Sequence, residues 1–269
     1  MKRRHLLISL STSACALAYG FHRQLAVAQL AQNSISLPLP PLDPNAARCP
    51  DGNGLFVLYY GAIANPPAQD ESLKTIMSKQ PNFVIFADSN EAKQRLRSDI
   101  PVYVHQNGGR AIMYVALGYG NNSSTDIDDK IDDAMKAGYD GIFFDEAAVS
   151  AEIHPWNAAR AARVKSYETS RNKTTLVIFN PGIASPPQSI FNYADIVSVE
   201  NFYNQKLPSY PDIWPWRWLA VQGDPAGEQS KTAPASAQEA IEGTETFRKN
   251  GGFWYYSSDL DVKNPLRPT

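Results

Sequence analysis

The feature that most constrains the fold is a series of eight apolar runs, each rich in β-branched and aromatic residues and separated from the next by a more polar segment. Hydrophobicity within each run is nearly continuous instead of alternating, which is typical of parallel strands buried on both faces. We therefore predict strands over residues 55–63, 82–88, 110–120, 141–146, 174–180, 196–201, 216–223 and 252–259.

The segments between these runs have the composition and punctuation of helices. Pro155 suits the first turn of one helix, and Gly138 suits the end of another. Eight strands that alternate with helices predict an α/β fold, a single (β/α)8 TIM-type barrel over residues 55–269. A doubly wound open sheet is the alternative, but no G-x-G-x-x-G motif follows the first strand. The predicted helices are 71–78, 91–106, 127–136, 155–170, a short one at 188–193, and 235–249.

Residues 1–28 have the layout of a secretory signal peptide. The KRR sequence at 2–4 is a basic start with a twin-arginine character, residues 6–21 are mostly apolar or small, and the AVA sequence at 26–28 offers a cleavage site. We therefore expect a secreted or periplasmic protein. A membrane anchor is less well supported because the apolar run is short and contains Ser, Thr and Gly. Lipid attachment at Cys15 is a weaker alternative still.

The segment that follows, residues 29–54, is too rich in proline for regular structure, so we expect an N-terminal arm or tether. Cleavage after residue 28 would remove four basic residues and no acidic one, which makes the mature chain more acidic than the formal net charge of −2 of the full chain. No basic stripe indicates nucleic-acid binding. Only Cys49 would remain after cleavage, so we expect no internal disulfide.

Only two histidines, His105 and His154, lie outside the signal segment, and neither has another histidine nearby in the sequence. Without an H-x-H or H-E-x-x-H pattern, a zinc hydrolase or a metal-dependent deacetylase lacks its ligands. A Ser-His-Asp triad has no support beyond a single histidine. We expect neither a metal nor a cofactor, and we expect a monomer without a stable membrane span.

Polar side chains gather where the predicted strands end, which is where function belongs in a (β/α)8 barrel. These ends carry carboxylates, amides and phenols, and none carries Lys, Arg or His. That lining lacks phosphate-binding chemistry, but it offers hydrogen bonds for hydroxyl groups, aromatic faces for sugar rings and carboxylates for acid–base work. We predict a polysaccharide substrate, catalytic residues Asp145, Glu146 and Glu200, and substrate-binding residues Tyr59, Asp88, Tyr119, Asn180, Asn201, Gln222, Tyr255 and Asp259.

The fourth run ends on two adjacent carboxylates, Asp145 and Glu146. Successive residues of a strand point to opposite faces, so both cannot face the barrel axis in regular strand geometry. One should face the substrate, while the other lies sideways as a supporting or proton-transferring group, or the strand opens at this point. Glu200, two strands further on, would supply a carboxylate across the mouth, and glycosidase chemistry needs such a pair.

The stretch after the sixth run, residues 203–218, contains two tyrosines and three tryptophans. These rings either pack the loop onto the barrel or form a stacking wall for a polysaccharide beside Glu200. In the second case Trp214 is the best candidate for a ring that stacks on a sugar.

Five blocks of the sequence, IMYVALGYG, GYDGIFFDEAA, LVIFNPG, ADIVSVEN and GFWYYSSD, resemble the spherulin-4 family in order and spacing across roughly residues 55–260. The resemblance implies a (β/α)8 barrel and a glycoside hydrolase related to families 135 and 114. Members of those families cleave α-1,4-linked galactosamine or N-acetylgalactosamine polymers of microbial exopolysaccharide. The resemblance also implies that Asp145 is the nucleophile or oxocarbenium stabiliser, Glu200 the general acid/base, and Glu146 a supporting carboxylate.

The chain also departs from that family. Asp88 stands where the second strand usually ends in an Asn-Pro stretch with glycines, and the loop after the third strand, NNSSTD, is short. The D-x-x-D-x-D-x-E spacing of chitinase-type barrels is absent as well. Two hypotheses therefore remain open: an exported endo-glycosidase that acts on an amino-sugar polymer, and a non-catalytic carbohydrate-binding surface protein on the same barrel. The three acidic residues together favour the enzyme.

Overall fold

The computed structural model of the protein describes residues 56–59, 63–86, 96–200, 207–208, 210, 213–222 and 254–257, together with residues 247, 249 and 252. Within these residues, eight strands form one sheet in the order of the chain, and consecutive strands pair in parallel. Every strand lies inside the run predicted for it. The strands are β1 (Phe56–Tyr59), β2 (Phe83–Phe86), β3 (Arg110–Ala116), β4 (Gly141–Asp145), β5 (Leu176–Phe179), β6 (Ile196–Glu200), β7 (Trp218–Gln222) and β8 (Trp254–Ser257).

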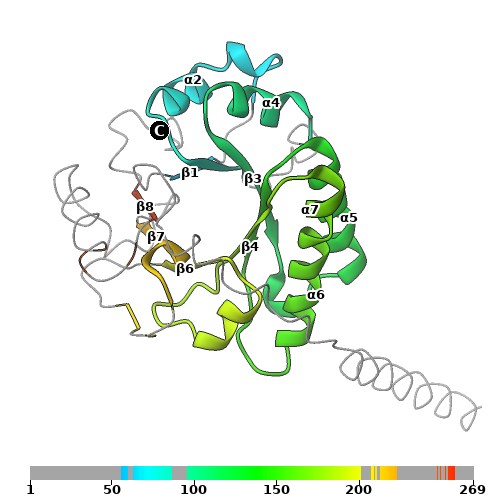
Figure 1. Ribbon diagram of the computed structural model, residues 1–269, viewed down its shortest axis with the longest axis vertical. Helices are drawn as coiled ribbons and strands as arrows, with labels where there is room; N and C mark the ends of the chain where they lie inside the picture. The colour runs from blue at the N-terminus through cyan, green and yellow to red at the C-terminus, as the bar shows by residue number, and fades with distance from the viewer. Residues whose placement is uncertain are drawn as a thin grey trace, which may run out of the picture. The chain divides into compact units, whose positions relative to one another are not determined.

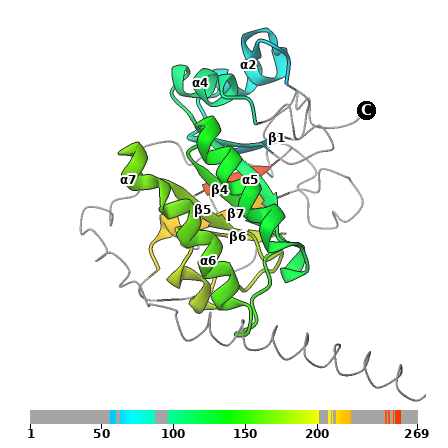
Figure 2. The same ribbon diagram turned by 90° about the vertical axis from the view of Figure 1, so that its right-hand side faces the viewer.

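Helices alternate with the strands and lie outside the curled sheet (Figures 1 and 2). None of the helices in the described part of the chain is long and apolar enough to cross a membrane. The alternation confirms the predicted parallel α/β fold. The α-helices are α2 (Glu71–Ser78), α4 (Asp99–Gln106), α5 (Ser124–Ala137), α6 (His154–Lys165) and α7 (Tyr167–Arg171), and the 3-10 helices are η1 (Pro67–Gln69), η2 (Gly118–Gly120), η3 (Gln188–Asn192) and η4 (Pro215–Arg217).

Local signals in the sequence set several helix ends. The Asp70 side chain accepts the Leu73 N–H at the start of α2, and Gly138 ends α5 in the left-handed conformation. The single helix predicted over 155–170 is two helices, α6 and α7, which meet at Ser166. The Ser166 hydroxyl donates to the Arg163 carbonyl, a local bond that competes with regular helix formation. Of the helix predicted over 235–249, only residues 247 and 249 are described, and both are helical.

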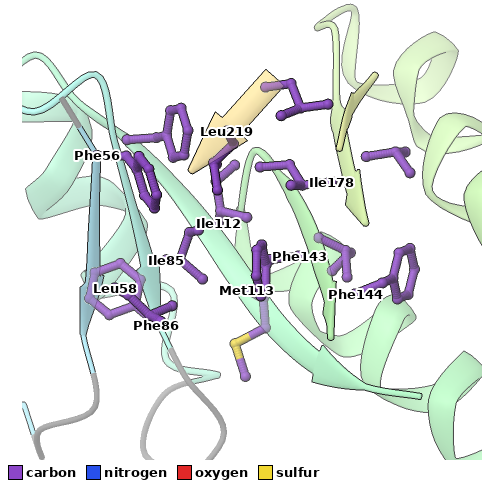
Figure 3. Close-up of a cluster of buried hydrophobic side chains, with 14 of the residues drawn as sticks. Phe56, Leu58, Ile85, Phe86, Ile112, Met113, Phe143, Phe144, Ile178 and Leu219 are labelled. Atoms are coloured by element: carbon purple, nitrogen blue, oxygen red, sulfur yellow. The ribbon is translucent and has the colours of Figure 1, made fainter. Parts of the chain in front are cut away.

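The alternation of side chains along the strands divides the core into two layers, and Figure 3 shows part of it. Phe144 and Phe179 belong to the layer that faces the helices, because Phe179 packs edge-on against Tyr193, which in turn contacts His154 of α6. The opposite phase lines the inner face of the sheet. Its members include Phe56, Leu58, Ile85, Ile112, Tyr114, Phe143, Ile178 and Leu219.

A repeated arrangement ties the amino ends of the strands together. Asp140, which precedes β4, donates its N–H to the Ala111 carbonyl at 2.7 Å and accepts the Ala111 N–H on its carboxylate at 2.8 Å. Asp195, which precedes β6, makes the same two bonds with Val177 of β5, each at 2.8 Å. In both cases one aspartate satisfies both backbone groups of a residue in the neighbouring strand, which extends the ladder beyond the strand itself.

Each of these aspartates also has a basic partner. Asp140 is 1% exposed and contacts His105, at 2.7 Å, and Lys173. Lys165 contacts the Asp195 carboxylate at 2.8 Å. Arg217, which precedes β7, is buried and donates to the Asp195 carbonyl at 3.0 Å and the Phe191 carbonyl at 2.8 Å. The amino edge of the sheet is therefore held by ion pairs and charge-assisted hydrogen bonds.

The two strands at the ends of the hydrogen-bonded order approach each other. Residues of β1 and β8 have Cα atoms within 8 Å, although the ladders recorded among the described residues join only consecutive strands. The carboxyl ends of all eight parallel strands lie on one edge of this curled sheet.

Candidate functional site at the carboxyl edge of the sheet

Asp145, the last residue of β4, is at the centre of the polar groups at this edge. Its side chain is half-buried and belongs to the inner phase of the sheet. The Tyr114 hydroxyl, from β3, donates to Oδ2 at 2.6 Å, and the Asn180 amide, which follows β5, donates to Oδ1 at 2.7 Å. The carboxylate is thus held by neutral donors from the strands on either side of its own.

Asn180 is fixed as firmly as the carboxylate that it binds. It is 2% exposed, and its side-chain oxygen accepts the Gly182 N–H at 3.2 Å, which orients the amide so that its NH2 group faces Asp145. Its backbone N–H donates to Phe144, and its backbone carbonyl accepts the Ala147 N–H. The Asn-Pro-Gly turn therefore joins the end of β5 to the segment that follows Asp145.

Glu146 resolves the geometric problem of two adjacent acids. Strand β4 ends at Asp145, and Glu146 has a φ of 53°, in the left-handed region that residues other than glycine rarely adopt. The chain therefore leaves the strand between the two acids, which corresponds to the second of the two expected geometries, in which the strand opens at this point. The Glu146 carboxylate is half-buried, and within the described residues it has no hydrogen-bond or ion-pair partner.

A second left-handed residue lies against the first. Tyr119, in η2, has a φ of 52°, and its N–H donates to the Glu146 carbonyl at 2.7 Å. Gly120 beside it also has positive φ, and a Cβ there would lie 2.7 Å from the Ile153 side chain. Two strained residues in contact at the end of a strand are typical of a functional site, because the surrounding packing must hold them in place.

The structure brings together Asp145, Glu146, Asn180 and Tyr119, all predicted from the sequence. Tyr119 is 56% exposed, which leaves its ring accessible from solvent. Glu200, Gln222 and Tyr255 lie in β6, β7 and β8, with Glu200 and Gln222 as the last residues of their strands; only their backbone positions are described. Asp88, Asn201 and Asp259 lie outside the described residues.

Two residues predicted to bind substrate lie elsewhere. Tyr59 is 2% exposed and packs edge-on against Phe86 in the layer that faces the helices, so it belongs to the core. Trp214 is 43% exposed, but it lies immediately before η4 and β7, and its carbonyl accepts the N–H of Arg217. Because Arg217 binds carbonyl groups that precede β6, Trp214 belongs to the amino edge of the sheet, opposite Asp145.

Sequence reasoning missed two residues on the inner face. Tyr114 was part of a predicted strand interior, yet its hydroxyl binds Asp145. Ser198 is fully buried two residues before Glu200, and its hydroxyl has no hydrogen-bond partner in the described part of the protein. For Ser198 the signal was present, because counting back by two from Glu200 gives a polar position of the same phase. Placing Tyr114 beside Asp145 requires the register between β3 and β4, which pairs Tyr114 with Phe143.

The charges at this edge are unbalanced. Within the described ranges, no Lys, Arg or His forms an ion pair with Asp145 or Glu146. Nor does any group of three His, Cys, Asp or Glu side chains in those ranges have the spacing to hold a metal ion. Two consecutive acids, one of them held by a phenol and an amide, can bind a polyhydroxylated ligand and exchange protons with it.

Fold and site together define a parallel α/β protein in which the acids at the carboxyl end of β4 have no basic partner among the described residues. The chain belongs to the Spherulin4 family, spherulation-specific family 4. The model of that family matches residues 80–241, which is more than half of this chain. This confirms the family expected from the sequence blocks. A comparison with curated proteins finds no match.

Several solved structures have a similar arrangement at low identity. A protein from Coccidioides immitis assigned as a deoxyribose-phosphate aldolase is 10% identical over 88% of this chain and 93% of its own, with a TM-score of 0.45. A second protein from the same organism, assigned to the dihydrodipicolinate synthase family, is 10% identical over 80% of this chain and 70% of its own, with a TM-score of 0.42. The spore cortex-lytic enzyme SleL of Bacillus megaterium QM B1551 is 13% identical over 75% of this chain and 59% of its own, with a TM-score of 0.39.

Proposed function

We propose that this protein is a glycoside hydrolase that cleaves within an α-1,4-linked galactosamine or N-acetylgalactosamine polymer. The observation that carries the proposal is the setting of Asp145, which ends a strand on the inner face, is held by two neutral donors, and is followed by Glu146, an acid with no ion-pair partner among the described residues. Membership of the Spherulin4 family supports the proposal. The amino-sugar polymer itself follows from the resemblance of the sequence blocks and not from the geometry of the site.

The proposed fold is a closed (β/α)8 barrel, with β8 adjoining β1. The order of eight parallel strands and the approach of β1 to β8 within 8 Å support closure. In such a barrel the carboxyl ends of β4 and β6 lie across the same opening, so that Asp145 and Glu200 can act on one bound sugar. Position 200 shares the inner phase of β6 with position 198, by the period-two alternation of strands.

In the proposed mechanism, Asp145 is the nucleophile or the stabiliser of the oxocarbenium-like transition state. Both of its oxygens accept hydrogen bonds, which suits a group that presents negative charge to the anomeric carbon. Glu200 is the general acid that protonates the leaving oxygen and then the base that activates water. Glu146 is a supporting carboxylate, and the exposed ring of Tyr119 beside it is a platform on which a sugar can stack.

We also propose that the chain is exported through the signal peptide over residues 1–28 and then consists of a Pro-rich arm and the barrel. The polymers concerned are extracellular, so a hydrolase that acts on them must leave the cytoplasm. Mass spectrometry of the exported protein tests this, because cleavage after Ala28 gives a mature chain that begins at Gln29.

The decisive experiment measures the release of reducing ends from purified α-1,4 galactosaminoglycans that differ in N-acetylation. The wild-type protein, Asp145→Asn and Glu200→Gln are assayed in parallel, with polymer binding measured for all three. We expect release by the wild type and by neither variant, and retained binding. Tight binding by all three proteins without release by any would instead identify a carbohydrate-binding protein that does not cut its ligand.

A further inference from the structure

Tyr114 reaches the candidate site from β3, the strand next to β4. Its ring is half-buried and stacks on Phe143, with 5.9 Å between the ring centroids. The ladder pairs Tyr114 with Phe143, which lies two residues before Asp145 on the same face of β4. From this position the Tyr114 hydroxyl donates a hydrogen bond to Asp145 Oδ2 at 2.6 Å. That length is typical of a hydroxyl group that donates to an ionised carboxylate.

The carboxylate has a second donor on its other side. Asn180, which follows β5, donates to Oδ1 at 2.7 Å. One donor would leave the carboxylate free to rotate about its bond to Cβ, whereas two donors on separate strands fix its plane. Each donor is fixed in turn, Tyr114 by its stack on Phe143 and Asn180 by its bond from the Gly182 N–H. Such support from neighbouring side chains is what a reacting group needs to keep a productive geometry.

We propose that Tyr114 is a positioning residue for the reaction at Asp145, and that its hydroxyl fixes the plane of that carboxylate toward the anomeric carbon of the bound sugar. The inference rests on the proposed glycosidase function. It assigns Tyr114 no proton transfer, since the hydroxyl hydrogen stays on the phenol throughout. The sugar contacts Asp145, and Tyr114 acts only through it.

The variant Tyr114→Phe tests this with little disturbance, because it keeps the ring and its stack on Phe143 and removes only the hydroxyl. We expect kcat on the galactosaminoglycan to fall about 10- to 100-fold, with KM changed by no more than about twofold. A matched control is Tyr210→Phe, which removes a hydroxyl that donates to the Pro186 carbonyl at 2.9 Å. The Tyr210 ring stacks on Trp218, the first residue of β7, at the amino edge of the sheet and opposite Asp145. The control should keep the wild-type kcat.

Thermal unfolding of each variant completes the experiment. A wild-type protein that releases no ends overturns the proposed function, and this inference falls with it. A wild-type protein that is active while Tyr114→Phe has the same kcat overturns this inference alone. A loss of kcat accompanied by a raised KM and a lowered melting temperature would assign Tyr114 a structural role and would also overturn it.

Discussion

The two ends of strand β4 carry the same side chain in opposite surroundings. Asp140, at the amino end, is 1% exposed and has His105 and Lys173 as partners. Asp145, at the carboxyl end, is half-buried and is held by the Tyr114 hydroxyl and the Asn180 amide. Asp140 is therefore buried beside basic partners. Asp145 has no basic partner among the described residues, and its partial exposure leaves it accessible to a ligand.

This contrast extends along both edges of the sheet. At the amino edge, the half-buried Asp195 and the buried Arg217 repeat the pattern of charge with partners supplied by the protein, Lys165 for the carboxylate and backbone carbonyls for the guanidinium. At the carboxyl edge, the Glu146 carboxylate has no hydrogen-bond or ion-pair partner among the described residues, and the backbone is strained at Glu146 and Tyr119. Charges that the protein satisfies by itself stabilise the fold, whereas charges that it leaves unsatisfied are available for chemistry.

The sharpest test of the comparison is one substitution made at each end of β4. At the carboxyl end, Asp145→Asn removes the proposed nucleophile while keeping its shape. We expect hydrolysis to fall roughly a thousandfold or more, and the free energy of unfolding to change by less than about 1 kcal/mol. Reducing-end assays and urea unfolding measure the two effects. A large loss of stability with activity retained would reverse the roles of the two ends.

At the amino end, Asp140→Asn should have the opposite effect. The amide oxygen can still accept the Ala111 N–H, but the charge opposite Lys173 and His105 is lost from a buried position. We expect the free energy of unfolding to fall by about 2–3 kcal/mol, with kcat unchanged in the folded protein. Urea unfolding measures this. The control is Asp132→Asn, which breaks a more exposed pair with Arg163 and should cost less than about 1 kcal/mol.

The amino edge also predicts how stability depends on pH. Burial by itself lowers the pKa of Lys165, but the Asp195 and Glu168 carboxylates outweigh burial and hold that pKa above its ordinary value of about 10.5. The stabilisation from its charge is therefore complete below pH 10.5 and is lost as pH rises through the raised folded-state pKa.

Unfolding free energies measured across this alkaline range should fall less steeply in Lys165→Met than in the wild type. Lys74→Met removes a lysine of the exposed pair with Glu71 and serves as the matched control, with a slope close to that of the wild type. An equal slope in Lys165→Met and the wild type would mean that the amino-edge ion pair contributes nothing to the alkaline limb.

Most of the fold could be predicted because parallel strands buried on both faces leave a strong pattern, and all eight observed strands fall inside predicted runs. Asp145 and Asn180 were predictable from their place at strand ends. The hydroxyl of Tyr114 was not, because a pattern of apolar residues does not tell which phase of a strand faces inward. Trp214 could have been placed correctly, since a residue four positions before a parallel strand must lie near its amino end.

The smallest effect concerns the strain at the carboxyl edge. Glu146→Gly replaces a left-handed residue, with φ of 53°, by the residue that adopts this conformation without steric cost. The added freedom of the unfolded chain offsets part of the gain, so we expect the free energy of unfolding to rise by at most about 1 kcal/mol while hydrolysis falls. Asn172→Gly is the matched control at the end of α7, where φ is 48°, and it should leave hydrolysis unchanged. If Glu146→Gly instead destabilises the protein as Asp140→Asn does, Glu146 supports the fold, and the distinction between the two edges fails at this residue.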